Sequence, residues 1–546
     1  MKRKLFSSII VVGLMATILA GCQKGDLLDN PNVASSSSTV PVSLILNRIT
    51  NEIYYGGGVM DANGITSNSS SGPAQNEGPW SEVHRWNQFY LSLYSYYWGG
   101  NNYNWSNSAT MYSVLKYVEL MEGQIPAQYG TLPNPYAGLA KFFRAYLFVW
   151  YTQRVGDIPM SQAGVSSIST PAYDSQHDVY KNSLALLDTA NTLLGAVAAT
   201  SQGGNTVSGD IYGLTVVQWQ KVVNTFRLRV LISLSKRAVD NADLNIPTQF
   251  ANIINNPTQY PIMSGIADNL QFKYNAVYNK YPIAPNYSPY DFYEAMNQTF
   301  LNITTASQDP RTFVAATPAP AQITGGKLVS DFTAYVGADV NVSQATLLIN
   351  ATNGQYSYAN FLRYFADPSG ATEEPAIIIG YPEMCFNIAE AANRGWISSS
   401  LASTWYYNGI AGSMAMYNVK DGTVIPIGDD KGHSLGSVTA SVTTFLANPN
   451  VTFSADPATQ LNQILTQKYV AFWQNSGWEA FYNWRRTGVP ALGQGGSGIG
   501  TPTNAIPIRW QYPTDESVEN TANWQKAITS QYGGTDDITQ PMWLIK

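Results

Sequence analysis

The stretch from residue 137 to residue 162, AGLAKFFRAYLFVWYTQRVGDIPMSQ, decides the fold class. In its first half, apolar side chains recur at three- and four-residue spacing, which predicts a long helix with one broad apolar face. These side chains are Leu139, Phe142, Phe143, Tyr146, Leu147, Val149 and Trp150. Three cations fall at the polar edges of that face, Lys141, Arg144 and Arg154. The helix is expected to end at Gly156, where Asp157 can hydrogen-bond the backbone just downstream and Pro159 fixes the exit of a turn.

Helical periodicity extends to both sides of this stretch. It predicts further helices over residues 44–56, 108–122, 173–199, 215–240, 374–395, 401–419 and 459–475. Residues 241–372 keep no long apolar period and are rich in Pro, Asn, Gly and Tyr, so they are expected to form an irregular insertion with short strands such as Lys327–Val336. Helices joined by short turns favour antiparallel pairs, although no clean repeat of tetratricopeptide length is visible.

Composition limits the kinds of partner and chemistry. Of 546 residues, 45% are hydrophobic and only 12% are charged, and the formal net charge is −6. A surface made mainly of neutral polar side chains lacks the Lys and Arg stripes that nucleic acid requires, and it suits sugars or peptides. The three histidines, His84, His177 and His433, are far apart, and the Gly-rich run 493–498 follows no predicted strand. We therefore expect neither a metal site nor a nucleotide cofactor.

Residues 1–21 are predicted to be a lipoprotein signal peptide. A basic start and an apolar run lead to Leu-Ala-Gly-Cys, which resembles the bacterial lipobox ending at Cys22. Cleavage would make Cys22 the lipid-bearing N-terminus, followed by a flexible tether over residues 22–43. A plain signal peptide with a chance cysteine is the alternative. If Cys22 carries lipid, Cys385 has no intramolecular partner, which predicts a small buried thiol and no disulfide.

The densest aromatic stretch crosses a Gly-Gly-Asn-Asn break at residues 99–102. A core helix needs no aromatic-lined loop, whereas flat rings stack on sugars or peptide planes, and Asn and Arg orient them. The candidate ligand-binding residues here are Trp98, Asn101, Tyr103, Trp105, Arg85 and Trp86, with core packing as the alternative. Tyr287 and Tyr290, in the tyrosine-rich part of the irregular region, form a second candidate ligand wall, for which a packed lid is the alternative.

Several phrases, in order along the chain, resemble the SusD/RagB family of bacterial outer-membrane lipoproteins. The first is the aromatic helix that ends in Gly-Asp-Ile-Pro at residues 156–159. The most specific joins Gln467-Lys468-Tyr469 to Glu479 and to the Arg-Arg-Thr-Gly-x-Pro run at 485–490. The others are Trp219-x-Lys221 with Asn224 and Leu228-Arg229, Asp309-Pro310-Arg311, Tyr381-Pro382-Glu383 with Ala389-Glu390-Ala391 and Arg394-Gly395, and a closing segment over 506–520.

This resemblance implies a mostly α fold on a tetratricopeptide-like scaffold of helical pairs. One binding domain would span residues 44–546, with the scaffold over about 44–240 and 374–546 and an irregular ligand face over about 241–372. It implies a non-catalytic lipoprotein, anchored in the outer membrane, that captures a nutrient, usually a glycan, for a partner SusC-like TonB-dependent transporter barrel. Asp26 and Asp29 resemble a signal that sends such lipoproteins to the cell exterior.

Three alternatives remain open at the level of sequence. The first is a peptide-binding member of the same family, and the second is a structural lipoprotein without a ligand. The third is a surface glycoside hydrolase, which needs two carboxylates ~5–10 Å apart, assembled from distant positions or from a pair such as Glu373-Glu374. That pair is expected at a helix start, where carboxylates favour the helix dipole anyway. Arg485 and Arg486 are expected to be ion-paired structural residues rather than phosphate ligands.

Overall fold

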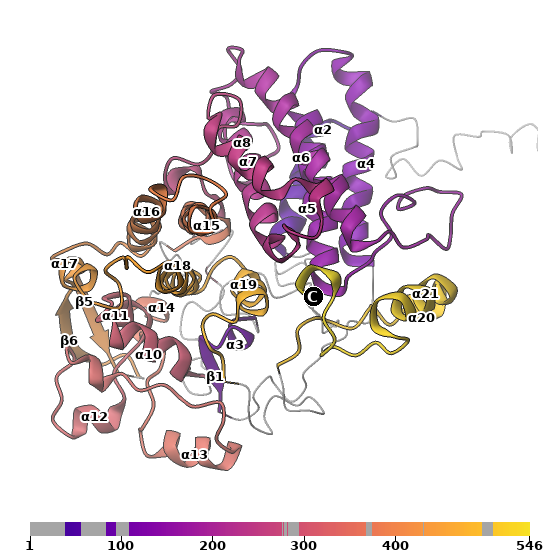
Figure 1. Ribbon diagram of the computed structural model, residues 1–546. Coiled ribbons are helices and arrows are strands. Elements are labelled where there is room, and N and C mark those ends of the chain that lie inside the picture. The colour runs from indigo at the N-terminus through magenta and orange to yellow at the C-terminus, as the bar shows by residue number, and fades with distance from the viewer. Residues whose placement is uncertain are drawn as a thin grey trace, which may run out of the picture.

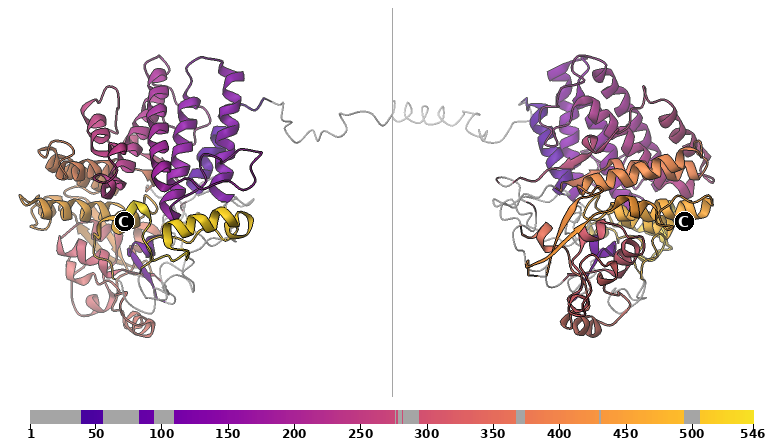
Figure 2. Two further views of the ribbon diagram at one scale, coloured as in Figure 1. Left: turned by 45° about the vertical axis from the view of Figure 1, so that its right-hand side comes forward. Right: turned by 90° about the vertical axis from the view of Figure 1, so that its left-hand side faces the viewer.

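The computed structural model of the protein describes residues 39–55, 83–93, 109–275, 277, 281, 294–366, 374–429, 431–493 and 506–546. Over these residues the chain is mostly helical, with three two-stranded antiparallel sheets. In Figure 1 the long helices of the first half form an upper bundle, and short helices form a lower body. Both views in Figure 2 show the same division into an upper bundle and a lower body. The mostly helical fold class predicted from the sequence is confirmed.

Helices of the upper bundle pack against one another in chain order. They are α2 (Val42–Tyr55), α4 (Ala109–Tyr129), α5 (Pro135–Val155), α6 (Gln176–Ala198), α7 (Val216–Ser233) and α8 (Ile246–Asn255). Each helix from α4 to α7 contacts the next one, and α2 packs on α4. The array continues through α15, which packs on α7, and through its neighbours. These are α15 (Tyr381–Asn393), α16 (Leu401–Met416), α18 (Pro457–Ala471) and α19 (Glu479–Thr487).

The lower body is built from short elements. Its helices are α3 (Val83–Trp86), α10 (Gln298–Ala306), α11 (Arg311–Ala315), α12 (Pro320–Thr324), α13 (Gln344–Thr352), α14 (Phe361–Tyr364) and α17 (Val442–Leu446). The paired strands are β1 (Tyr90–Ser92) with β3 (Glu294–Met296), β2 (Leu270–Phe272) with β4 (Ala376–Ile379), and β5 (Val424–Gly428) with β6 (Ser434–Thr439). The helices α20 (Glu516–Glu519) and α21 (Thr521–Tyr532) lie beside the bundle.

Local signals explain the limits of α5. Asn134 caps its start by accepting a hydrogen bond from the Ala137 N–H at 3.0 Å, and Pro135 stands in the first turn. Gly156 ends it with φ of 103°, in space where a Cβ atom would lie 2.5 Å from the Tyr532 hydroxyl oxygen of α21. The predicted turn is confirmed, and it is locked against the C-terminal helix.

Two side chains of this stretch differ from the expectation. Asp157 does not bond the turn just after it. Its Oδ1 accepts from the Gln176 N–H at 2.8 Å and so fixes the start of α6. Arg154 is buried rather than at a polar edge, with its guanidinium 3.5 Å from the centre of the Trp150 ring. Helical spacing alone places Arg154 on a side that α19 and the C-terminal segment then cover.

Two predicted elements are wrong. The helix expected over 374–395 begins at Tyr381, because the preceding run Ala376–Ile379 forms strand β4. Three consecutive isoleucines suit a strand, and Gly380 and Pro382 separate the strand from the helix. The expected strand Lys327–Val336 is a turn followed by a short 3-10 helix, Phe332–Ala334. Asp331 caps that helix by accepting from the Thr333 N–H at 2.8 Å, a local bond that competes with strand pairing.

Other expectations fare differently. Cys385 is buried and free, as predicted. Burial raises the pKa of its thiol to about 12, so the thiol stays neutral and packs as a small apolar side chain. The signal peptide, Cys22 and nearly all of the tether lie outside the described residues, while α2 already begins at Val42. None of the described helices is both long enough and apolar enough to cross a membrane.

A buried network of charged and amide side chains joins α7, α15, α18 and α19. Arg229 of α7 binds Glu383 of α15 and lies 3.7 Å from a carboxylate oxygen of Glu479. Lys468 of α18 donates to Asn387 Oδ1 at 2.6 Å and to Asn483 Oδ1 at 2.7 Å. We call this network the polar belt.

The belt closes through a bidentate ion pair. Arg486 binds the two oxygens of Glu390 at 2.5 and 2.8 Å and also donates to Asn483. Burial would raise the pKa of Glu390, but the Arg486 and Arg394 guanidinium groups outweigh it and hold that pKa at about 2. The carboxylate therefore stays charged. Arg486 is ion-paired, as expected, whereas Arg485 donates to the carbonyl oxygens of Gln153 and Ile508.

Replacing Glu390 with Ala tests the belt. The Arg486 charge would lose its buried partner, which costs about 3–5 kcal/mol in unfolding free energy. Urea denaturation followed by tryptophan fluorescence measures the loss. The control is Asp240→Ala, whose exposed carboxylate faces Arg237 at 3.1 Å and should cost less than about 1 kcal/mol. Similar losses in the two variants would contradict a structural role for the belt.

Asp157 predicts a pH-dependent stability. Burial raises its pKa from 3.8 to about 6, although the Gln176 N–H bond opposes this. A carboxyl with a raised folded pKa contributes stability that is full below its unfolded pKa and is lost as pH rises through about 6. Asp157→Asn removes this loss, so its stability relative to wild type should improve by roughly 2 kcal/mol between pH 4.5 and 7.5. Denaturation at the two pH values measures it, and a constant difference would contradict the assignment.

Candidate functional site

The predicted ligand residues divide into two groups. Arg85 and Trp86 belong to helix α3, which the structure describes. The others fall in two segments outside the described residues: Trp98, Asn101, Tyr103 and Trp105 in residues 94–108, and Tyr287 and Tyr290 in residues 282–293. For the second group, the structure therefore describes only the residues that flank each segment.

Arg85 and Trp86 lie in the interior. The Arg85 guanidinium binds Glu294 of β3 with an N–O distance of 2.7 Å, and both side chains are buried. The Trp86 ring stacks on Trp510 with centroids 5.2 Å apart and meets Trp478 edge-on at 5.3 Å. In this position the two side chains support strand β3 and the aromatic core, and a ligand at the surface would not contact them directly.

The pairing of β1 with β3 brings the two aromatic segments to one place. Ser92 is directly opposite Glu294 in the antiparallel register. Segment 94–108 leaves the described chain after Leu93, and segment 282–293 rejoins it at Glu294. Segment 94–108 thus starts next to the residue at which segment 282–293 ends, although the two are far apart in sequence. The Gln344 side chain of α13 donates to the Leu93 carbonyl oxygen and holds this point from below.

Gln88 ties a third segment to the same place. Its Nε2 donates to the Gly493 carbonyl oxygen at 2.8 Å, and its Oε1 accepts from the Gly493 N–H at 2.9 Å. The same Oε1 accepts from the Thr299 hydroxyl of α10 at 2.8 Å. Gly493 is the last described residue before segment 494–505. Gln88 has φ of 54°, a conformation that costs energy for a residue with a side chain and that these bonds hold in place.

This group of contacts rests on α18. The Tyr469 hydroxyl donates to the carbonyl oxygens of Asn87 and Gln88 at 2.8 and 3.1 Å. The Phe89 ring stacks on the Tyr469 ring with centroids 4.7 Å apart. Burial raises the pKa of Tyr469 well above its ordinary value, so it remains a hydroxyl donor. We name the described residues 87–93, 294–299 and 493 the strand-pair platform.

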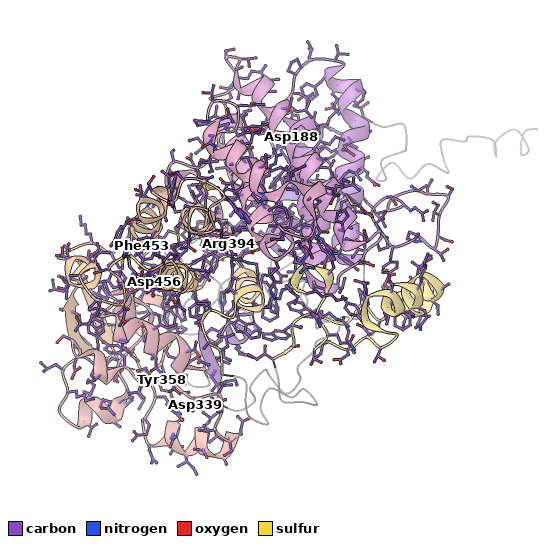
Figure 3. All side chains as sticks on the ribbon, viewed as in Figure 1. Asp188, Asp339, Tyr358, Arg394, Phe453 and Asp456 are labelled. Carbon is purple, nitrogen blue, oxygen red and sulfur yellow. The ribbon has the colours of Figure 1, made fainter. Side chains whose placement is uncertain are left out.

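A polar hollow of about 420 Å³ lies beside the platform. Its walls come from the start of α10, from residues 339–341 and from residues 490–493. Asp339 lies in the lower body near α10 (Figure 3). The polar side chains of the wall are mainly amides, which are Asn297, Gln298, Asn302 and Asn341, together with Thr299 and Asp339. Amides and hydroxyls can bind neutral hydroxyl groups, and the volume is within the range of small-ligand sites.

A second hollow of about 450 Å³ lies near strands β2 and β4. Asn269, Gln271, Lys273, Tyr274 and Asn418 supply its polar wall. It flanks the start of the tyrosine-rich segment, since Asn275 precedes the undescribed residue 276. Tyr274 meets Tyr281 with ring centroids 5.1 Å apart, so these two described tyrosines lie together at the start of that segment.

The carboxylates that could form a catalytic pair are engaged in structural contacts or share only a small hollow. Glu374 pairs with Arg363 just before β4, not at a helix start as expected, and Glu373 lies outside the described residues. Glu119 and Glu516 do share a hollow, but its volume is about 160 Å³, below the usual range for ligand sites. Glu516 accepts from the Tyr173 hydroxyl at 2.5 Å, and Glu119 lies 3.5 Å from Arg144.

The described side chains that could bind a metal ion also lie apart from one another. Within the described ranges, no three His, Cys, Asp or Glu side chains gather as a metal site would need. His433 contacts Asp429 at 2.8 Å on the surface, and His177 lies between Asp178 and Asp243. These contacts are surface pairs.

Sequence analysis missed the residues that form the hollow. Asn297 and Gln298 stand in the run MNQTFLN, where the cap signal of Asn297 indicates a helix start and nothing more. Gln88 carries no sequence signal for a positive φ or for its link to a residue 405 positions away. Such residues become visible only when the fold brings three distant segments together.

Comparison with known proteins gives a consistent result. The family model for SusD-like proteins, described as starch-binding and associating with the outer membrane, matches residues 39–513. Two SusD homologues from Bacteroides fragilis are 27% and 30% identical, with TM-scores of 0.76 and 0.72. In both, 93% of this chain is covered, with 100% of the first and 99% of the second. A chitin-binding protein shares the fold at 22% identity, a TM-score of 0.65, and coverage of 92% of this chain and 99% of its own. Among curated proteins, none matches.

Proposed function

The chain belongs to the SusD-like family of nutrient-binding outer-membrane proteins, and we propose that it captures a glycan at the cell surface and passes it to a transporter without altering it. The neutral polar composition, with only 12% charged residues, supports an uncharged ligand over nucleic acid. The description of the family as starch-binding supports a glycan over a peptide.

One observation carries the proposed location of the binding site. The β1–β3 pair places Ser92 opposite Glu294, so segment 94–108 begins next to the residue at which segment 282–293 ends. Chain geometry then limits Trp98 to about 18 Å from Leu93 and Tyr290 to about 14 Å from Glu294. Aromatic faces for stacking and the Asn101 amide for orientation can therefore act on one ligand at the strand-pair platform.

The proposed anchor and partner follow the same logic. Cys22 would carry the lipid that holds the protein in the outer membrane, with the tether allowing it to face the cell exterior. The partner would be a SusC-like TonB-dependent transporter barrel, to which the bound glycan is handed. The resemblance of Leu-Ala-Gly-Cys at residues 19–22 to a lipobox and the family's association with the outer membrane support this assignment.

A binding assay with product analysis tests capture without conversion. The protein truncated after Cys22 is titrated with starch, chitin and xylan oligosaccharides and with a peptide panel by calorimetry, and the mixtures are then separated by chromatography. Saturable glycan binding with intact oligosaccharides supports the proposal. Shortened products would contradict it and would direct attention to Glu119 and Glu516. Binding of peptides alone would contradict the glycan assignment.

Replacing Trp98 with Ala tests the aromatic segment. Loss of one stacking face should weaken binding of the glycan about tenfold, while cooperative thermal melting stays unchanged. Calorimetry gives the affinity and circular dichroism gives the melting curve. Trp524→Ala is the matched control, since it removes a half-buried Trp from α21, which lies away from strand β1 of the platform (Figure 1). Unchanged affinity would contradict the ligand role, and loss of cooperative melting would show that Trp98 is core.

A further inference from the structure

Asn297, one of the residues that line the polar hollow beside the strand-pair platform, has a buried donor without an acceptor among the described atoms. Asn297 caps α10, and its Oδ1 accepts from the Thr299 N–H at 2.9 Å. This bond fixes the orientation of the amide, so that Nδ2 is the remaining polar atom. The side chain is 1% exposed, and Nδ2 has no hydrogen-bond partner among the described atoms. A buried unpaired amide costs stability unless a bound group satisfies it.

Two further amides stand on the same wall. Gln298 and Asn302 line the hollow from the first turns of α10, one half-buried and one exposed. The structure records no hydrogen bond for either side-chain amide in the part of the chain that it describes. Each amide offers both a donor and an acceptor, which is the pattern that a sugar hydroxyl group complements. The accessible amides of Gln298 and Asn302 therefore line a space with unused hydrogen-bonding capacity.

The opposite wall is apolar at its base. Val340 and Leu492 line it and are nearly fully buried, and Pro490 also lines it, while Ile303 adds an apolar side chain from α10. A pyranose ring has the same division, with C–H groups on its faces and hydroxyl groups around its edge. An ion or a fully polar ligand would leave the apolar wall unused. The hollow is thus matched to an amphiphilic ring rather than to a phosphate or a carboxylate.

The negative charge of the hollow favours neutral sugars over acidic ones. Of the described residues that line the hollow, Asp339 alone is charged, and its Oδ1 accepts from the N–H and the side chain of Asn341 at 2.8 Å. No described cation pairs with Asp339. A uronic acid or a sulfated sugar would bring a second negative charge close to this carboxylate, which is unfavourable in a partly desolvated site.

We propose that this hollow is a subsite for one uncharged sugar ring of the captured glycan, held by the accessible amides of Gln298 and Asn302. The subsite rests on the proposed function and specifies its substrate class as a neutral oligosaccharide. It adjoins the platform because Thr299 and Gly493 line the hollow and also bind Gln88. One chain of sugar units can therefore contact both the platform and the hollow.

The double variant Gln298→Ala with Asn302→Ala tests the subsite. Both residues are within α10, where Ala is well tolerated, and neither makes a protein hydrogen bond that the substitution would break. The probes are maltoheptaose, xylohexaose, cellohexaose and laminarihexaose as neutral glycans, and oligogalacturonate as an acidic one. We expect at least a tenfold rise in Kd for the neutral glycan that wild type binds, with an unchanged melting curve. Gln525→Ala on α21 is the control and should leave Kd unchanged.

The outcomes separate the two proposals. If no glycan binds wild type, the proposed function itself is overturned. If a neutral glycan binds and the double variant keeps the wild-type Kd, only the subsite is overturned. If wild type prefers oligogalacturonate, the neutral class is overturned. Asp339→Asn adds an independent check, because removing the carboxylate charge should strengthen binding of oligogalacturonate several-fold and leave the neutral probe within twofold.

Discussion

The polar belt is the constraint on which the rest of the structure depends. Charges in a protein interior are tolerated only when they are paired and hydrogen-bonded, and the pair Glu390–Arg486 meets both conditions. Arg229 and Glu383 do the same between α7 and α15. These pairs have one satisfactory arrangement, so they fix how the late helices sit on the early bundle. Burial lowers the pKa of Lys468 to about 8, and its two amide partners keep the ammonium group in place.

The belt is also connected to the strand-pair platform. Three consecutive residues of α18 connect it to the lower body. Gln467 accepts from Arg311, which is itself paired with Asp309, Lys468 belongs to the belt, and Tyr469 holds the backbone of Asn87 and Gln88. The lower body and the strand-pair platform are therefore seated on the same helix that closes the scaffold. Under the proposed function, a platform fixed in this way would limit the entropy lost when a ligand binds.

Sequence alone predicted the parts of the fold that local patterns encode. The helices with strong apolar periodicity, such as α5 and α7, form where they were expected, and the turn at Gly156 follows its residue types. The wrong predictions have local causes. An isoleucine run before Gly380 forms a strand, and Asp331 caps a 3-10 helix where alternation had indicated a strand. Arg154 shows a third limit, since only tertiary packing decides which edge of a helix another element covers.

The candidate site was predictable only in part, for the same reason. Density of aromatic residues identified the two segments, but nothing in the sequence indicated that β1 and β3, which flank them, pair. Both are three-residue strands without a distinctive pattern. The phrases that resemble the SusD/RagB family contain the belt residues Arg229, Glu383, Glu390, Lys468 and Arg486. Their physical role is thus structural, and the ligand-binding residues must be found elsewhere, on the face that they support.

Hydrogen–deuterium exchange with and without a saturating neutral oligosaccharide tests the central claim most directly. The claim is that the ligand binds where the two aromatic segments meet at the strand-pair platform. The account predicts slower exchange in peptides covering residues 94–108, 282–293 and 297–302, with the bundle helices unchanged. Protection confined to other regions, such as residues 266–275 with 415–418 or the surface of α4 and α5, would place the ligand elsewhere and contradict the account.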